Sequence, residues 1–211
     1  MSKNQNINIP MRDGMSLFER VLKRLFDIVC SFIGILFLSP IYLIIYIVMR
    51  IQGDGPVIFS QERIGYKGKP FRIFKYRTMY VDSESEGEPK LAQKDDDRLT
   101  PFGKFLREHH LDELPQLWNV FVGDMSFVGP RPERKFFIDK IMELDKNYVY
   151  IYKMRPGLTS EATVYNGYTD TMEKMLIRLR MDLEYWQKRS LWIDIKIIFI
   201  TVMSIVNGKK F

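Results

Sequence analysis

The feature that most restricts the fold of this sequence is an uncharged apolar run of about 22 residues, residues 28–49. A helix that crosses a bilayer needs about 20 apolar residues. However, Ser39 and Pro40 lie in the middle of the run. Proline removes a backbone hydrogen bond and clashes with the preceding turn, so a helix must bend or break there. We therefore expect two helical segments inside the membrane, with a break at Ser39-Pro40.

Positive charge flanks this run on both sides, and it normally stays on the cytoplasmic side of a membrane. A segment that enters the bilayer, turns at Pro40 and leaves by the same face satisfies both observations. A kinked helix that crosses the bilayer remains the alternative. The basic residues before the run are Arg20, Lys23 and Arg24, and those after it are Arg50, Arg63, Lys67, Lys69 and Arg72.

The remaining pattern predicts an α+β fold. The 211 residues, 46% hydrophobic and 27% charged, suit one domain. We expect a flexible tail over 1–17, a helix-break-helix over 18–52 whose course in the membrane stays open between the two alternatives, and a small, mostly helical domain with short strands over 53–211. The predicted strands cover 57–59 and 71–74, a charged loop covers 81–97, and helices cover 101–109, 112–122, 133–145 and 171–188.

The last apolar segment, residues 190–206, is interrupted by Asp194 and Lys196. Its uninterrupted part, residues 197–206, is too short to cross a bilayer. It is predicted to be either an amphipathic helix in the membrane interface, with Trp192 at headgroup level, or a buried core helix.

The formal net charge of +6 favours a polyanionic partner. Nucleic acid, anionic lipid and a diphosphate substrate all fit the charge, but no nucleic-acid-binding motif is present, so nucleic acid is not expected. The one cysteine, Cys30, lies in the apolar run and excludes a disulfide framework. A reducing cytoplasmic setting is the simplest interpretation.

Asp112 is the first candidate for chemistry. Leu117 and Phe121 recur at helical spacing, and Pro115 is tolerated only in the first turn of a helix. This spacing predicts a helix with Asp112 at or near its N-cap. Free amide donors and the helix dipole would keep the carboxylate ionised and attract a phosphate. The alternative is that Asp112 only caps the helix.

Basic residues on short loops bracket this acidic position. They are Lys75, Arg77, Arg107 and Arg131, and the last lies in a Gly-Pro-Arg-Pro segment. Arginine forks match phosphate oxygens, so the group is typical of a diphosphate site. Each residue taken singly would be read as a solvated surface charge.

Two other polar patterns are weaker. The run Asp95-Asp96-Asp97 imitates the metal-binding motif of many glycosyltransferases, but it lies in the polar loop and is predicted to be solvated. His109 and His110 are adjacent, whereas zinc ligands on a helix lie a turn apart.

In this order, the segments resemble the bacterial sugar transferases, the monotopic phosphoglycosyl transferases that initiate capsule, exopolysaccharide and glycoprotein glycan assembly. The resemblance runs from Phe18 over nearly the whole chain, and the length resembles the minimal form of the family. The matching segments are residues 23–27, 39–40, 55–59, 61–65, 74–79, 111–117, 123–126, 129–132 and 155–159.

The resemblance implies that Asp112 and Glu113 are the catalytic pair. In the family the aspartate attacks the β-phosphorus of a UDP-sugar, releases UMP and forms a covalent intermediate. Polyprenyl (undecaprenyl) phosphate then takes the phosphosugar. Magnesium (Mg2+) is the implied cofactor, with Asp112 and Glu113 as its expected ligands. For Glu113, proton handling stays open as the alternative to metal binding. The implied location is the cytoplasmic face of the bacterial inner membrane, with the re-entrant form of the apolar run and a cytoplasmic catalytic domain over 53–211.

We expect all four basic residues to serve substrate binding. Arg107 and Arg131 are expected to bind the substrate phosphates, and Lys75 and Arg77 to bind the nucleotide side or to support the structure around it. Asp182 and Tyr185 fall in a family Asp-Xaa-Xaa-Tyr segment, which implies a supporting part in substrate binding. Residues 160–168 depart from the family pattern, so the sugar stays open. The competing functions are a glycosyltransferase that moves the sugar alone and releases UDP, and a basic membrane-surface module without catalysis.

Overall fold

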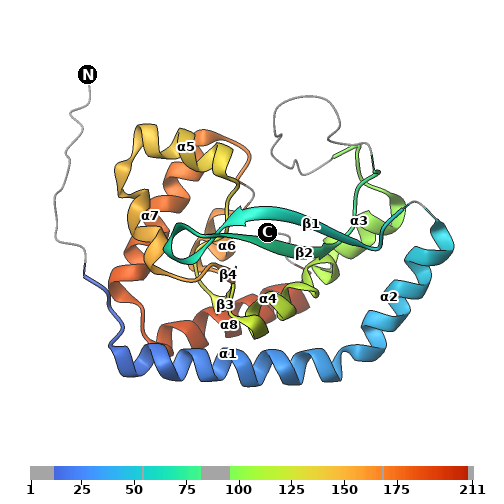
Figure 1. Cartoon of the computed structure of the whole chain (residues 1–211), viewed down its shortest axis with the longest axis horizontal. Helices are drawn as coiled ribbons and strands as arrows, with labels where there is room; N and C mark the ends of the chain where they lie inside the picture. The colour runs from blue at the N-terminus through green and yellow to red at the C-terminus, as the bar shows by residue number, and fades with distance from the viewer. Residues whose placement is uncertain (1–11, 54, 82–95, 168, 209–211) are drawn as a thin grey trace.

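Helices frame two small sheets in the computed structural model, which describes residues 12–53, 55–81, 96–167 and 169–208 (Figure 1). The helices are α1 Leu17–Phe37, α2 Ser39–Gln52, α3 Pro101–Glu108, α4 Gln116–Val122, α5 Lys135–Leu144, α6 Glu161–Asn166, α7 Met172–Lys188 and α8 Leu191–Val206. Three 3₁₀ helices are η1 Tyr66–Gly68, η2 Leu111–Glu113 and η3 Lys146–Lys153. The strands are β1 Ile58–Ile64, β2 Pro70–Tyr76, β3 Ser126–Val128 and β4 Gly157–Thr159. The predicted α+β class is confirmed.

The longer sheet is an antiparallel hairpin of β1 and β2, paired from Ile58 opposite Tyr76 to Ile64 opposite Pro70. Both strands were predicted, at shorter lengths. The second sheet is a parallel pair of β3 and β4, which the sequence analysis did not predict. These strands have three residues each, and such short runs carry no alternating pattern to detect. Most of the predicted charged loop, and residues 1–11 of the predicted tail, lie outside the described residues.

Asn119 of α4 joins the hairpin to the helices. Its side chain is fully buried and sits against the edge of β2 that faces away from β1. The amide oxygen accepts the backbone N–H of Phe74 at 3.1 Å, and the amide nitrogen donates to the Arg72 carbonyl at 2.8 Å. One side chain thus occupies two backbone groups that a third strand would otherwise pair.

The apolar run is broken as expected. α1 ends at Phe37, α2 begins at Ser39, and the two axes are bent by 57°. Pro40 has no N–H for the Leu36 carbonyl four residues earlier, and the Ser39 hydroxyl donates to that carbonyl instead, at 2.7 Å. No single described helix has the length and apolarity to cross a bilayer. α1 and α2 meet that test only when taken together as a bent pair.

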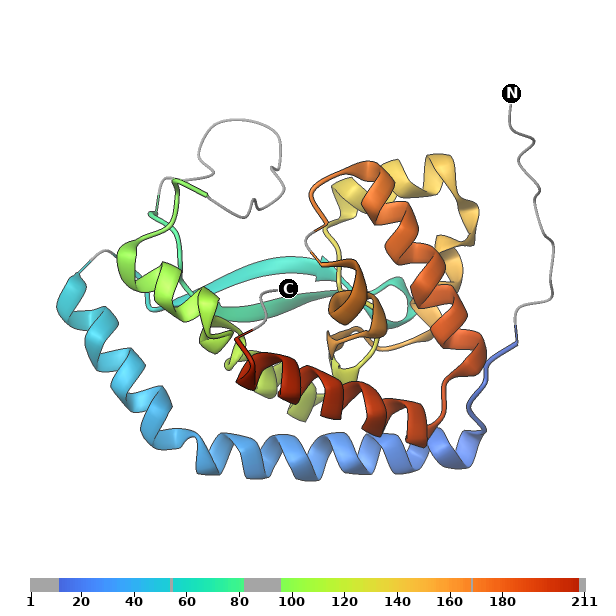
Figure 2. The same ribbon diagram turned by 180° about the vertical axis from the view of Figure 1, so that it is seen from behind.

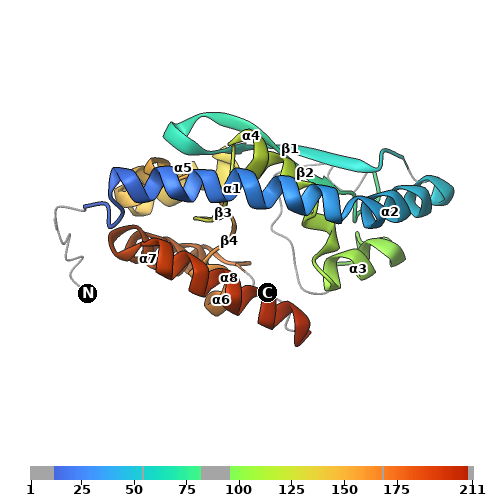
Figure 3. The same ribbon diagram turned by 90° about the horizontal axis from the view of Figure 1, so that it is seen from below.

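Large apolar side chains are exposed along α1, α2 and α8, which face the viewer in the view from below (Figure 3). Phe37 is 77% exposed, and Trp192 is 75% exposed. α8 runs beside α1 (Figure 2) and turns Asp194 and Ile197 inward while its other face stays open. The helix at 190–206 therefore combines features of both predicted alternatives: one side packs on the domain and the other is exposed and apolar.

Charged side chains fasten α1 to the rest of the domain. Arg24 donates to the Val120 and Phe121 carbonyls at 2.6 and 2.8 Å, and so caps the C-terminal end of α4. The buried carboxylate of Asp27 accepts the Phe127 N–H of β3 at 3.1 Å. These contacts hold the long apolar helix under α4 and the small parallel sheet.

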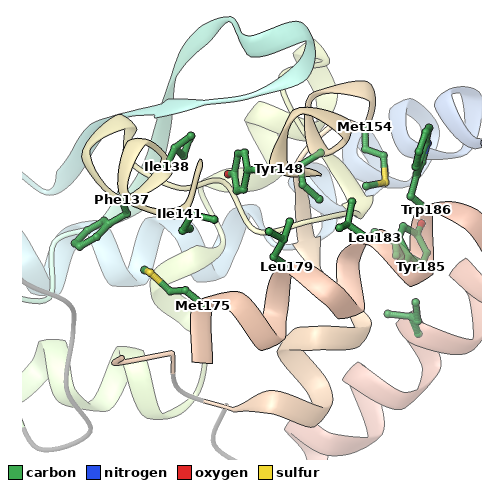
Figure 4. Close-up of a cluster of buried hydrophobic side chains, with 13 residues drawn as sticks. Phe137, Ile138, Ile141, Tyr148, Met154, Met175, Leu179, Leu183, Tyr185 and Trp186 are labelled. Carbon is green, nitrogen blue, oxygen red and sulfur yellow. The ribbon is translucent and has the colours of Figure 1, made fainter. Parts of the chain in front are cut away.

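The main core lies between α5, η3 and α7, where Ile138, Ile141 and Leu179 pack together (Figure 4). The chain just before α1 is tied to this unit. Gly14 donates to the Trp186 carbonyl at 3.0 Å, and Asp13 accepts two hydrogen bonds from Arg189. The described part of the predicted tail, residues 12–16, is therefore held against the end of α7.

We predict that Asn119→Ala lowers the free energy of unfolding by about 2–3 kcal/mol, because it leaves two buried backbone groups of β2 unpaired. Thermal unfolding of the purified chain in neutral detergent would measure the change. Lys135→Ala is the control: it removes only an exposed ion pair with Asp139, which contributes less than about 1 kcal/mol. Equal losses in the two variants would contradict the bracing role of Asn119.

Candidate active site

Asp112 and Glu113 lie in η2, a single 3₁₀ turn between α3 and α4. The predicted helix over 112–122 is wrong at its start, since α4 begins at Gln116 with Pro115 as its cap residue. Asp112 is therefore not the N-cap. Pro115 cannot donate to the residue 111 carbonyl, and the chain closes a tighter turn, with Leu114 N–H bonded to that carbonyl at 3.3 Å.

The turn is fixed by a contact with the bent α1–α2 pair. Tyr42 of α2 donates its hydroxyl hydrogen to the Leu114 carbonyl at 2.6 Å. Tyr42 and Leu114 also pack against a buried cluster that contains Leu106, Ile45 and Tyr76, and Leu106 is fully buried there. The acid pair is thus held one residue from a direct contact with α2. The sequence analysis missed Tyr42, because a tyrosine in an apolar run gives no sign of a distant hydrogen-bond partner.

Lys75 of β2 reaches both carboxylates. Its Nζ lies 2.5 Å from Glu113 Oε1 and 4.0 Å from Asp112 Oδ2. Burial raises the pKa of Asp112, which is 5% exposed, and the nearby charge of Glu113 adds to the rise against the opposing Lys75, Arg107 and His110. Burial also raises the pKa of Glu113, but Lys75, Arg131 and His110 outweigh it and lower that pKa to about 2. The ammonium group therefore holds Glu113 as the ionised partner.

Arg107 and Arg131 also act on this pair. The charge of Arg107 acts on Asp112, and that of Arg131 acts on Glu113. Arg107 Nη1 is buried, and no hydrogen-bond acceptor meets it among the described residues. A buried cationic donor without an acceptor is costly unless a ligand supplies one. Arg131 is exposed, on a loop beside β3 and β4.

That loop is held by close backbone contact. Gly129 donates to the Thr159 carbonyl at 3.0 Å, and Gly157 donates to the Pro130 carbonyl at 2.9 Å. A Cβ at Gly129 would lie only 2.3 Å from the Arg155 carbonyl oxygen, so a side chain cannot fit there. The glycine allows the loop to approach β4 and sets the position of Arg131.

Arg77 lies elsewhere. It is buried beside Gly55, its backbone N–H donates to the Val57 carbonyl at 3.0 Å, and its Nη1 meets no acceptor among the described residues. Gly55 adopts φ +115°, and a Cβ there would lie 2.6 Å from Arg77 Nη1. No described contact brings Arg77 to the acid pair, and its predicted part at the nucleotide side stays a prediction.

Asp182 and Tyr185 of α7 belong to buried charge networks. Burial raises the pKa of Asp182 to about 7, despite the opposing charge of Arg178. Tyr185 donates to Asp194 Oδ1 at 2.5 Å, and Asp194 is also ion-paired with Lys23 of α1. Tyr185 therefore links α7 to α8. The predicted part of both residues in substrate binding stays a prediction.

A buried ion group that the sequence analysis missed lies behind Arg131. Glu133 contacts Arg178 at 3.4 Å and Arg63 at 3.6 Å, and the charges of Arg178 and Arg131 act on each other. Glu133 follows the Gly-Pro-Arg-Pro segment by one residue, which was the only available signal. This group links the Arg131 loop to β1 and α7.

One polar prediction is wrong. Asp96 was expected in a solvated run, but its side chain is 5% exposed and accepts hydrogen bonds from Arg98 at 2.7 and 2.6 Å. A neighbouring guanidinium two residues along replaces the water that an aspartate would otherwise bind. Asp95 lies outside the described residues.

The acid pair suits a cation for which the protein supplies only some of the ligands. Among the described residues, no three histidine, cysteine, aspartate or glutamate side chains converge as a metal site. Mg2+ commonly takes one or two protein carboxylates and completes its shell with water and substrate phosphates. Two adjacent carboxylates in a partly buried turn fit that pattern.

An apolar groove of about 450 Å³ lies beside the turn. It runs from the α1–α2 break at Ser39 to Pro115, three residues after Asp112. Trp118, 52% exposed, forms part of its wall. Its remaining lining residues are Ile35, Tyr42, Ile58 and Phe74.

Comparison with known proteins places these features in a family. The family model described as "Bacterial sugar transferase" matches residues 18–208. A UDP-glucose:undecaprenyl-phosphate glucose-1-phosphate transferase of Klebsiella pneumoniae is 41% identical over 210 residues, covering 96% of this chain and 45% of the relative. A UDP-N-acetylgalactosamine-undecaprenyl-phosphate N-acetylgalactosaminephosphotransferase of Aeromonas hydrophila is 38% identical, covering 89% and 44%.

A further relative of the first description, from Caulobacter vibrioides, is 40% identical over 187 residues, covering 88% of this chain and 70% of the relative. The chain spans less than half the length of the first two relatives. The resemblance found in the sequence is confirmed by a match over nearly all of the chain: it belongs to the bacterial sugar transferase family.

Proposed function

We propose that this chain transfers a phosphosugar from a UDP-sugar to polyprenyl phosphate, with Asp112 as the nucleophile. The observation that carries the proposal is a buried carboxylate on a fixed turn, with Lys75 and Arg107 near Asp112 and Arg131 near the adjacent Glu113. Such a site gathers cations around one acid pair, as a diphosphate substrate requires. The names of the relatives supply the substrate class.

In the first step, a carboxylate oxygen of Asp112 attacks the β-phosphorus of the UDP-sugar. The anhydride bond to the α-phosphate breaks, UMP leaves with the bonding electrons, and the phosphosugar becomes linked to Asp112 as an acyl phosphate. Arg107 supports this step. Its buried Nη1 has no acceptor among the described residues, so it can donate a hydrogen bond to a phosphate oxygen as negative charge develops there.

In the second step, a phosphate oxygen of the polyprenyl phosphate attacks the same phosphorus. The bond to Asp112 breaks, and the carboxylate is restored as the diphosphate-linked lipid leaves. Lys75 faces both carboxylates, so it can steady Glu113 while the charge on Asp112 is lost and regained. Neither step needs a redox partner or an external base.

Asp112 and Glu113 are the side chains that would hold Mg2+, together with substrate phosphates. The ion would neutralise charge on the diphosphate and so favour attack by an anion. The low pKa of Glu113 keeps its carboxylate ionised and able to bind a cation at neutral pH.

The same geometry supports a proposal for the membrane arrangement. We infer that the bent α1–α2 pair enters one leaflet and returns, which leaves both its ends and the acid pair at the cytoplasmic face of the inner membrane. The apolar groove from Ser39 to Pro115 then offers the lipid substrate a surface for its first isoprene units. Its phosphate would reach the turn that carries Asp112.

We predict that Asp112→Asn abolishes transfer, a loss on the order of a thousandfold or more, because an amide cannot form the acyl phosphate. Glu113→Gln is expected to be severely impaired as well. UMP release and formation of the diphosphate-linked lipid are measured across a panel of UDP-sugars. Asp139→Asn, an exposed aspartate of α5, is the control and keeps wild-type activity. Release of UDP in place of UMP would show that the sugar moves alone.

Arginine substitutions test the phosphate site. Arg107→Ala and Arg131→Ala are expected to lose at least about tenfold in kcat/KM, because each removes a cation from a partly desolvated phosphate. Lysine at either position keeps the charge but loses the planar fork, so activity should also fall. Arg180→Ala, an exposed residue of α7, is the control. If the three alanine variants are equally active, the phosphate site is misplaced.

A third test concerns the bent α1–α2 helix pair. Replacing Ser39 and Pro40 together by alanine restores a continuous backbone ladder, so we expect the helices to straighten and part of the population to cross the membrane. The readout is labelling of an introduced Ser2→Cys by an impermeant maleimide in spheroplasts, in a Cys30→Ser background. Pro70→Ala, at the start of β2, is the control. Labelling of the parent chain from the periplasmic side would contradict a re-entrant hairpin.

A further inference from the structure

A second cavity, of about 650 Å³, lies away from the acid pair, where the start of α1 meets η1, η3 and the end of α7. None of its lining residues belongs to the proposed catalytic site. The lining residues are Arg12, Asp13, Arg20, Tyr66, Lys67, Val149, Tyr152, Lys153 and Trp186.

The cavity carries an excess of positive charge. Four of its lining side chains are cationic and one, Asp13, is acidic. Asp13 is engaged by Arg189, at 2.8 and 2.7 Å, and more loosely by Arg20, at 3.6 Å. Lys67 and Lys153 form no ion pair within the described ranges; each faces an aromatic ring instead. A site with so few anions of its own attracts one from outside.

The walls of the cavity are largely aromatic. Lys153 lies 5.3 Å from the ring centre of Trp186, and Lys67 lies 5.4 Å from that of Tyr66. Trp186 is 2% exposed, at one end of the main core cluster (Figure 4). Its indole N–H is buried and has no acceptor in the described part of the chain. The rings therefore form the apolar part of the lining, and the lysines supply its charge.

The position of the cavity indicates which anion it meets. Arg12 and Arg20 bracket the first turn of α1, where Leu17 is 71% and Phe18 is 70% exposed. Exposed apolar side chains next to cations and aromatic rings are typical of a surface at the headgroup level of a membrane. The cavity therefore opens beside the apolar surface of α1, where a lipid phosphate is at hand.

We propose that this cavity binds the phosphodiester headgroup of an anionic phospholipid. The lysines and Arg20 would contact the phosphate, and the aromatic walls would pack against the glycerol backbone. Such a site would hold the N-terminal end of α1 at the membrane surface, at the opposite end of that helix from the break. It goes beyond the proposed transfer reaction and takes no part in it.

The test uses the full chain in neutral detergent, titrated with short-chain phosphatidylglycerol below its micellar concentration. Binding is followed by the shift in unfolding temperature. We expect saturable binding, with little response to phosphatidylcholine of the same chain length. Lys67→Gln combined with Lys153→Gln should weaken the affinity about tenfold. Lys135→Gln combined with Lys174→Gln changes the net charge equally at exposed positions, and should leave the affinity unchanged.

Three outcomes would overturn the proposal. Equal weakening in the two double variants would show attraction by net charge alone. Equal binding of phosphatidylcholine would show a purely apolar contact. Tighter binding of UMP or inorganic phosphate than of phosphatidylglycerol, lost in the Lys67/Lys153 variant, would assign the cavity to a soluble anion. Asp112→Asn is expected to bind the lipid like the parent chain, so this result is independent of the transfer reaction.

Discussion

The capping of α4 by Arg24 is the contact on which the rest of the arrangement depends. A helix whose exposed side is apolar over its whole length would slide or rotate freely against a small domain if only apolar contacts held it. The guanidinium group of Arg24 bonds two carbonyls at the end of α4, and Asp27 takes an N–H of β3. Directional bonds to backbone groups set both rotation and register. The apolar helix α1 and α4, the helix after the acid pair, therefore behave as one piece.

The position of the acid pair depends on this contact between α1 and α4. Its turn is bounded by α4 on one side, and Tyr42 of α2 holds the next residue on the other. Both supports belong to elements joined to the apolar surface. In the proposed reaction, a lipid phosphate has little freedom to move along the bilayer normal, so the nucleophile must be held at a matching depth. Rigid contact with the α1–α2 pair meets this requirement without a mobile loop.

Local chemistry predicted part of this structure. The break at Pro40 and the hairpin strands depend on near neighbours in the chain, and both were found. The start of α4 was missed because the chain before Pro115 forms a 3₁₀ turn instead of an extra helical turn. Leu111 and Leu114 of this turn pack against the buried cluster that contains Leu106. The roles of Asn119 and Glu133 depend on partners more than 40 residues away. The residues next to them in the sequence do not identify those partners, since only folding brings the partners together.

The hydrogen bond from Ser39 to the Leu36 carbonyl has a consequence for how the protein is made. The carbonyl left free at the bend accepts its hydrogen bond from a side chain only three residues further along. The bend therefore needs no group from the rest of the chain. The partners that anchor α1, by contrast, leave the ribosome much later: Lys23 bonds the carbonyl of Val128, 105 residues further along. The α1–α2 pair can therefore bend during synthesis, before the rest of the domain folds onto it; in the proposed arrangement it does so in the lipid.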